Sequence, residues 1–174
     1  MLPSFRRLCS AALIVGCCYA ESLDARAIQA LSDEIAREFE AHELSKFERF
    51  FTEDFRCSVY GGKTILNREQ FLEALRQEAG RALGPVKVAI KLARIRVQGV
   101  SAMATWSEAT EYFLADAQGS KHRFRYSQNY DSQLVRKDGK WKFASITYPT
   151  QGSQKTLDGS PVRSLDELKN LLDR

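Results

Sequence analysis

The apolar residues of this 174-residue chain change their spacing after Pro85. Before Pro85 they recur at three- and four-residue steps, as in Ile28, Leu31, Ile35 and Phe39. After it they alternate, as in Val86, Val88, Ile90 and Leu92. The first spacing lines one face of a helix and the second lines one face of a strand. Helices followed by a run of strands predict an α+β fold, with the helices packed on one face of an antiparallel sheet.

The pattern predicts the following elements. Residues 22–51 form a helix and a second, shorter helix that starts at Leu44, and residues 54–63 form a turn, a short strand and a glycine break. Asn67 opens a third helix, because Asn-x-x-Gln is a capping-box pattern. Strands follow over 86–97, 102–114, 122–136 and 140–148. In the first of these the alternation changes parity near Ala93-Arg94, which indicates a β-bulge.

Two hairpins fix the expected strand registers. Glu111 opposite Arg125 is a favourable cross-strand pair, and this register also sets Glu108 opposite Gln128. Asp138-Gly139 is a strong signal for a two-residue turn, because both residues tolerate positive φ. That turn predicts three further pairs, which are Leu134 with Phe143, Ser132 with Ser145, and Tyr130 with Thr147.

Both registers predict the same inner face of the sheet. This face carries Trp106, Tyr112, Phe124, Tyr126, Tyr130, Leu134, Trp141 and Phe143. The opposite face carries Ser107, Glu111, Arg123, Arg125, Asn129, Asp131, Gln133 and Lys142 and is far more polar. A half-buried sheet turns its apolar face to the helices, so Trp141 is expected to point inward.

The order of elements resembles the NTF2-like superfamily, in particular its SnoaL-like and ketosteroid-isomerase-like members. The resemblance covers residues 24–150 and is carried by "FFTEDF", "NREQFLEAL" and the closing "VRKDGKWKFASI". It implies a cone-shaped, cystatin-like fold, in which a curved antiparallel sheet wraps around the N-terminal helices and encloses a pocket. This fold hosts isomerases, dehydratases, cyclases, non-catalytic binders and assembly modules, so it does not define a reaction.

The expected pocket holds one acidic group, Glu108, beside Gln128. A carboxylate among aromatic rings has a raised pKa and serves either as a base or ligand anchor or as part of a structural network. The expected ligand-binding residues are Trp106, Glu108, Tyr126, Gln128, Tyr130 and Tyr60. Asp54, after the second helix, is a weaker catalytic candidate, with a turn or cap as its other interpretation. His122 at the rim and His42 on a helix are expected to be solvated.

The first twenty residues have the plan of a signal peptide. Arg6 and Arg7 precede a short apolar run that ends at the small residue Ala20, and the run is too short to span a bilayer. Cleavage after Ala20 predicts a periplasmic protein without a transmembrane segment. The alternative is a lipid anchor on Cys17. Removal of residues 1–20 lowers the net charge from +4 to +2, a balance that argues against nucleic-acid binding.

Cys57 would then remain as a lone, buried thiol, so no disulfide framework is expected. With two histidines and no Cys/His cluster, the sequence indicates no metal and no cofactor. Residues 151–174 are expected to form a linker, up to residue 163, and a short amphipathic helix capped by Ser164. Its apolar stripe is Leu165, Leu168 and Leu172.

The domain organisation is therefore a signal peptide over residues 1–20, an NTF2-like domain over 21–150 and the tail. The favoured function is binding of a small, mostly apolar molecule in the bacterial envelope. The alternatives are an isomerase or lyase that uses the pocket carboxylate, and an assembly module without catalysis. A homodimer through the outer sheet face is expected.

Overall fold

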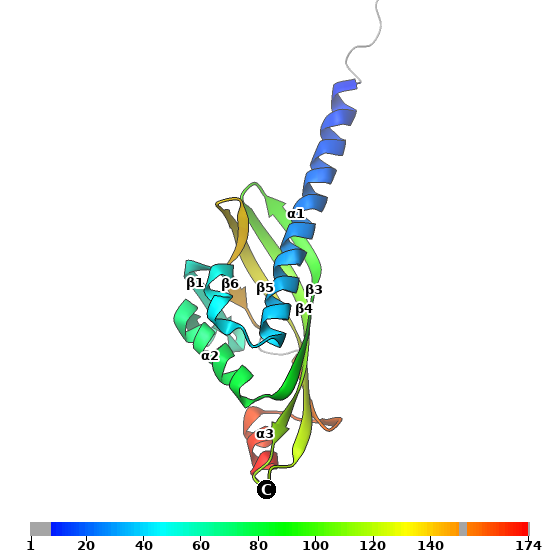
Figure 1. Ribbon diagram of the computed structural model, residues 1–174. Coiled ribbons are helices and arrows are strands. Elements are labelled where there is room, and N and C mark those ends of the chain that lie inside the picture. The colour runs from blue at the N-terminus through cyan, green and yellow to red at the C-terminus, as the bar shows by residue number, and fades with distance from the viewer. Residues whose placement is uncertain (1–7, 150–152, 174) are drawn as a thin grey trace, which may run out of the picture.

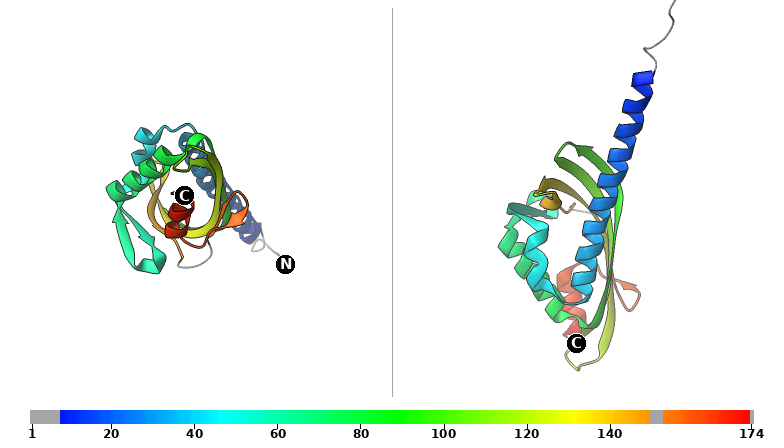
Figure 2. Two further views of the ribbon diagram at one scale, coloured as in Figure 1. Left: turned by 90° about the horizontal axis from the view of Figure 1, so that it is seen from below. Right: turned by 45° about the horizontal axis from the view of Figure 1, so that its top comes forward.

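The computed structural model describes residues 8–149 and 153–173. One sheet has the strand order β2-β1-β6-β5-β4-β3, and β7 and β8 extend it beside β5. The bounds are β1 (Phe51–Val59), β2 (Thr64–Asn67), β3 (Leu83–Gln98), β4 (Ser101–Ala115), β5 (Lys121–Lys137), β6 (Lys140–Thr147), β7 (Gln154–Leu157) and β8 (Ser160–Pro161). The sheet curls around the helices into a cone (Figures 1 and 2), which confirms the α+β prediction. The pair β1 and β6 is parallel and the other strand pairs are antiparallel.

The helical elements are α1 (Leu8–Glu40), η1 (Leu44–Phe50), η2 (Tyr60–Gly62), α2 (Arg68–Arg81) and α3 (Leu165–Leu172). The capping box that opens α2 is present. The Asn67 side chain accepts from the Gln70 backbone N–H at 2.9 Å, and the Gln70 side chain accepts from the Asn67 N–H at 3.0 Å. Two predictions near β1 were wrong. The strand begins at Phe51, which was expected on the helix, and the turn expected at Asp54 lies within the strand.

Helix α1 protects the edge of the sheet formed by β3. The Gln29 amide donates to the Ile90 carbonyl at 3.0 Å and accepts from the Leu92 N–H at 2.8 Å. At the last residue of α1, the Glu40 side chain accepts from the Val88 N–H at 2.8 Å. An exposed strand edge carries free backbone donors and acceptors. These two side chains therefore replace a neighbouring strand along that edge.

The predicted register between β4 and β5 is confirmed over its whole length. Glu111 pairs with Arg125 and Glu108 with Gln128, and Glu111 also forms an ion pair with Arg125. The predicted inner face is buried apart from Tyr126, which is half-buried, and Trp106 and Leu134 are fully buried. The parity change in β3 is confirmed as well, because the register shifts between Leu92 and Arg94.

The register between β5 and β6 was predicted correctly only next to the turn. Leu134 pairs with Phe143 as expected, but the register then shifts, and Ser132 pairs with Ile146 instead of Ser145. Thr147 pairs with Asp131, so the expected pair with Tyr130 was also wrong. The extra residue is on β6, where a bulge reverses which side chains point inward.

The tail is more ordered than the predicted linker. Strands β7 and β8 form a hairpin. Its strand β7 pairs with residues 124–127 of β5, on the part of β5 that precedes the residues paired with β6. Helix α3 then lies at the narrow end of the cone (Figures 1 and 2), where Leu168 is buried and Leu172 packs against the core. Docking of the helix is thus confirmed for these two leucines. The Leu165 side chain lies outside the described part of the structure.

Helix α1 begins at Leu8 and continues through the predicted cleavage site at Ala20. Its first turns project beyond the sheet (Figure 1), and among the side chains described from Leu23 onward, Ile28 is the first that belongs to the core cluster. Residues 1–7, which include Arg6 and Arg7, lie outside the described residues. Among the described residues, no helix combines the length and apolar character needed to cross a membrane.

Candidate functional site

A small cavity lies between the concave face of the sheet and the helices. Its volume is about 60 Å³, and side chains of α1, η1, α2 and five strands contribute to its wall. The lining is mostly aromatic and aliphatic, with Ile35, Phe39, Phe47, Phe51, Phe71, Leu75, Val88, Ile90, Tyr130, Phe143, Ile146 and Tyr148. The other lining residues are Glu108, Thr110 and Tyr126. An apolar chamber with a few convergent polar groups is the usual form of a small-molecule site.

Glu108 on β4 supplies the acidic group of this cavity. It borders the cavity, while protein atoms surround its carboxylate on the other sides. The Tyr126 hydroxyl donates to Oε1 at 3.0 Å, and Gln128 Nε2 donates to Oε2 at 3.2 Å. Thr110 Oγ1 is 3.3 Å from Oε1. Burial raises the pKa of Glu108, and these hydrogen bonds oppose that effect without cancelling it.

Three tyrosine hydroxyls surround this acid. Burial, together with the nearby Glu108 charge, raises the pKa of Tyr126, Tyr130 and Tyr148 well above their ordinary value. They are therefore neutral at any physiological pH and can act as hydrogen-bond donors. The Tyr130 and Tyr148 rings lie 5.2 Å apart between centroids. A ligand entering the cavity would thus meet one carboxylate and a neutral phenolic wall.

A second, half-buried carboxylate, Glu78 on α2, lies near Tyr112 and Tyr126 and was not singled out in the sequence. Burial and the charge of Glu108 raise the pKa of Glu78, while hydrogen bonds from Tyr126 and Tyr112 and the charge of Arg81 lower it. The Tyr112 hydroxyl is 3.4 Å from Glu78 Oε1. The sequence nevertheless carried a signal for the inward position of Glu78, in its spacing from the apolar residues of the same helix. Glu78 follows Phe71 by seven residues, and this places both on the inner side of the helix.

The bulge in β6 brings two unpredicted residues into the cavity wall, Ile146 and Tyr148. The assumed register had pointed residues 145 and 147 inward instead. The sequence carried a signal here too, because the apolar residues of this strand change parity after Phe143. That is the same kind of change that correctly indicated the bulge in β3.

The predicted site residues are not all placed at the cavity. Glu108, Tyr126 and Tyr130 line it. Gln128 reaches it only through its bond to Glu108. Trp106 is fully buried, stacks on Tyr130 with centroids 6.3 Å apart, and donates from Nε1 to Ser132 at 2.7 Å. It therefore belongs to the packed core beside the cavity.

The weaker candidates lie elsewhere. Asp54 is exposed on β1, and the Tyr60 side chain lies outside the described part of the structure. Cys57 is buried, and burial raises the pKa of its thiol to about 12, so it is not a nucleophile at neutral pH. His42 is exposed as expected, but it lies in the turn after α1 and not on a helix, so that part of the prediction was wrong. In the described part of the chain, no cluster of His, Cys, Asp and Glu could hold a metal ion.

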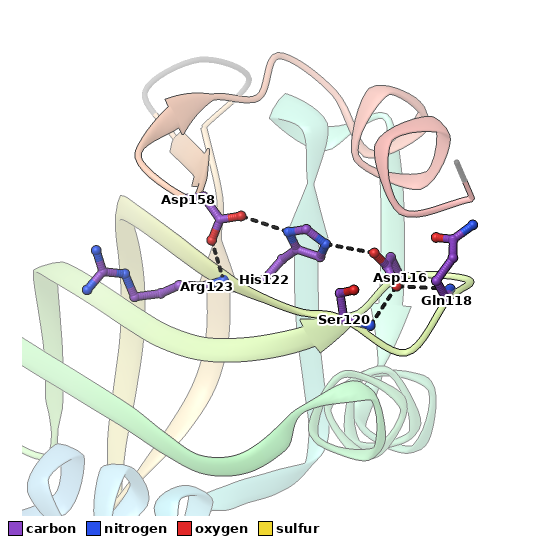
Figure 3. A network of polar contacts seen from close by, with 6 residues as sticks. All are labelled: Asp116, Gln118, Ser120, His122, Arg123 and Asp158. Carbon is purple, nitrogen blue, oxygen red and sulfur yellow. Dashed lines mark hydrogen bonds and ion pairs between the residues drawn. The ribbon is translucent and has the colours of Figure 1, made fainter.

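His122 is not the solvated residue that the sequence suggested. Its Nδ1 lies 2.7 Å from Asp158 Oδ2, and its Nε2 lies 3.0 Å from Asp116 Oδ2 (Figure 3). Asp116 also accepts from the Gln118 and Ser120 backbone N–H groups, and Asp158 accepts from the Arg123 N–H. The network joins the β4–β5 turn to the β7–β8 turn at the narrow end of the cone. It holds the tail and does not line the cavity described above.

A curved sheet closed around helices, with an apolar interior chamber, defines the cone-shaped NTF2-like or cystatin-like class of fold. Within that class the chain belongs to the SnoaL-like family, because the model of the SnoaL-like domain matches residues 20–147. This confirms the resemblance drawn from the sequence. A comparison with curated proteins found no match.

Solved structures share the fold at low sequence identity. A conserved protein from Planctomyces limnophilus is 15% identical, with a TM-score of 0.64 over 81% of this chain and 99% of its own. A hexachlorocyclohexane dehydrochlorinase, type 2, is 14% identical, with a TM-score of 0.60 over 83% of this chain and 93% of its own. A protein from Nostoc punctiforme, described as having a cystatin-like fold, is 14% identical, with a TM-score of 0.56 over 73% of this chain and 90% of its own. At these identities the likeness shows the fold alone.

Proposed function

We propose that this protein binds a small, mostly apolar molecule in the cavity and that Glu108 anchors the ligand's polar group. The observation that carries the proposal is the placement of one hydrogen-bonded carboxylate inside an otherwise apolar chamber. A buried carboxylate costs free energy. A ligand group that donates a hydrogen bond to Glu108 would recover part of that cost.

The cavity volume restricts the ligand. An apolar cavity of about 150 Å³ accepts benzene, whereas this one measures about 60 Å³. In this conformation a short-chain molecule fits, and a larger one requires the aromatic side chains of the helical wall to move apart. Phe39 and Phe47, with ring centroids 6.2 Å apart, form part of that wall.

The test is native mass spectrometry of protein purified from its own compartment, followed by identification of any small molecule released. We expect a low-mass, mostly apolar compound with one polar end, retained by the wild type and lost in Glu108→Gln. The matched control is Glu111→Gln, on the outer face of the same strand. Equal retention by all three proteins would contradict an anchoring role for Glu108.

A second candidate function is acid–base catalysis of the isomerase or lyase type. It is favoured by the raised pKa of Glu108 and by the neutral Tyr126 hydroxyl at the same site. Glu108 would remove a proton next to a carbonyl, and a tyrosine hydroxyl would donate to the developing oxyanion. Exchange of α-protons of short ketones for deuterium, followed by NMR, tests it. The wild type and Glu111→Gln would catalyse the exchange and Glu108→Gln would not.

Export to the periplasm is part of the same proposal. It rests on Arg6, Arg7 and the apolar run of the sequence. Intact mass of protein from the periplasmic fraction would give a chain that starts at Glu21, or one lipidated at Cys17. Full-length protein confined to the cytoplasm would refute export.

Self-association through the outer sheet face is proposed as well. Met103 and Phe113 are exposed on that face, with exposed fractions of 60% and 37%. Light scattering during size-exclusion chromatography would show a dimer, and Met103→Glu would convert it to a monomer. A wild-type monomer at all concentrations would refute this proposal.

A further inference from the structure

Helix α1 leaves one step of the β3 edge uncovered. Gln29 bonds to the Ile90 carbonyl and the Leu92 N–H, and Glu40 accepts from the Val88 N–H. In an antiparallel ladder the N–H and C=O of one residue point to the same side, and the side alternates along the strand. The Val88 carbonyl and the Ile90 N–H therefore also point toward α1. Among the described residues, neither of these two groups has a hydrogen-bond partner.

An open groove of about 390 Å³ lies at this step, between α1 and β3, which run side by side in Figure 1. Its lining consists of residues 88–91 of β3 and of Gln29, Asp33, Ala36, Arg37 and Glu40 of α1. Positions 29, 33, 36 and 40 share one face of the helix, because they recur at steps of four and three residues. Asp33 is turned to Gln29, from whose Nε2 it accepts at 2.8 Å. Ala36 ends in a methyl group, so the helix supplies no partner to the strand here.

The Gln29 side chain shows what kind of group fits this step. Its carboxamide donates to the carbonyl before Lys91 and accepts from the N–H after Lys91. The uncovered carbonyl and N–H flank Ala89 in the same way. A carboxamide carries a donor and an acceptor on one planar group, whereas an ionised carboxylate has no donor for the Val88 carbonyl.

The rim of the groove carries charges of both signs. Asp33 and Glu40 face Arg37 and Lys91 across it, and all four are exposed. Such a balanced rim gives no net preference for a cation or an anion, and it offers partners to both ends of a zwitterion. Hydrogen bonds exposed to water contribute little net free energy, so the rim charges have to supply part of the binding.

We propose that this groove binds the carboxamide side chain of glutamine or asparagine, free or within a peptide. The carboxamide bridges the Val88 carbonyl and the Ile90 N–H, and the rim charges hold the ammonium and carboxylate groups. Val88 and Ile90 line both this groove and the interior cavity, so β3 is the wall between the two. The site lies beyond the proposed function and does not involve Glu108.

The first test needs no ligand. Amide hydrogen exchange in the full chain, read by NMR, compares Val88, Ile90 and Leu92. We expect slow exchange at Val88 and Leu92, which donate to side chains of α1, and faster exchange at Ile90 between them. In Gln29→Leu the Leu92 amide should become as fast as Ile90. Equal protection of the three amides in the wild type would overturn the inference, because the step would then be closed.

The second test is a titration with free glutamine, with glutamate, and with tripeptides that carry either residue at the centre. The readout is the ¹⁵N–¹H shift of Ile90 and the slowing of its exchange. We expect saturable changes with the glutamine probes and none with the glutamate probes. A response to the free amino acid alone assigns a small-molecule ligand, and a response to the tripeptide assigns a peptide. Equal responses to glutamine and glutamate, or no response to any probe, would overturn the inference.

Variants separate this site from the cavity. Ala36→Leu fills the groove and should abolish the Ile90 response, whereas Ala30→Leu, at an exposed position of the same helix, should retain it. Glu108→Gln should also retain it, because a zwitterion is excluded from an apolar cavity. Loss of the response in Glu108→Gln would place the ligand in the cavity and overturn the inference, while it would support the proposed function. If Ala36→Leu does not fold, the wild type and Glu108→Gln still decide the question.

Discussion

His122 and Asp158, which belong to different hairpins, meet through a 2.7 Å contact between Nδ1 and Oδ2. The opposite ring nitrogen lies 3.0 Å from Asp116. One imidazole therefore joins the turn between β4 and β5 to the turn between β7 and β8 (Figure 3). The hydrogen bonds to both aspartates raise the pKa of His122, and the same bonds lower the pKa values of Asp116 and Asp158.

This contact predicts a pH window for docking of the tail. The raised pKa of His122 gives a stabilisation that is full below its ordinary value of 6.5 and is lost as pH rises through the raised value. The lowered pKa values of the aspartates give a stabilisation present above their ordinary value of 3.8 and lost in acid. Amide exchange of residues 154–157, corrected for intrinsic rates, should accelerate on both sides of this window. His122→Gln should remove the alkaline change and His42→Gln should not.

Replacement of Gln29 should destabilise the protein more than an ordinary surface change. Gln29→Leu leaves the Ile90 carbonyl and the Leu92 N–H of β3 without their side-chain partner. The expected loss is about 1–3 kcal/mol in the free energy of unfolding, measured in urea. Gln77→Leu, on the exposed surface of α2, is the control and should change stability little. An equal effect of the two substitutions would show that Gln29 does not protect the sheet edge.

Asp24 should anchor α1 to the wide end of the cone. It forms an ion pair with Arg136 and lies 3.4 Å from the Trp141 indole nitrogen, while the Arg136 guanidinium lies 4.6 Å from the Trp141 ring centroid. A partly exposed pair of this kind contributes at most about 1 kcal/mol. Asp24→Asn should therefore lower the free energy of unfolding by about that amount and should quench or shift Trp141 fluorescence. Asp33→Asn, on the same helix, is the comparison.

The buried acids predict a loss of stability as the pH rises. The pKa values of Glu78 and Glu108 are raised above 4.5, so between 4.5 and the raised values the folded protein holds more protons than the unfolded one. Stability then falls with increasing pH over that interval. In Glu108→Gln this decline should become shallower, because one of the two acids is gone. Urea denaturation at several pH values measures it, and parallel profiles for wild type and variant would refute the burial of this charge.

The parts of the fold that sequence reasoning recovered are those where local pattern and tertiary packing agree. Alternation in β4 and β5, the Glu111–Arg125 pair and the parity change in β3 led to the right registers. Glu108 was placed inside the cone by counting along paired strands, without any motif. The capping box at Asn67 was equally reliable, because its hydrogen bonds are local.

The remaining features depend on contacts between distant segments. Residues 154–161 are rich in polar and turn-forming types, so nothing local indicated that they would pair with β5. His122 meets Asp158 only because that hairpin docks. Glu78 looks like one more charged residue of a surface helix until Tyr126 and Glu108 are placed beside it. The bulge in β6 was missed because an ideal two-residue turn was extended along the whole strand.

Binding of short-chain probes to wild type, Glu108→Gln and Glu111→Gln tests the central claim most directly. The probes are a short-chain alcohol and a short-chain primary amide, both hydrogen-bond donors, and affinity is measured by saturation-transfer NMR at neutral pH. A hydrogen bond to a charged group contributes about 1.5–3 kcal/mol, so Glu108→Gln should bind roughly 10- to 100-fold more weakly while it melts cooperatively. Wild type and Glu111→Gln should bind the same probes equally. Equal affinity of Glu108→Gln and wild type, or the absence of binding to wild type, would contradict the account.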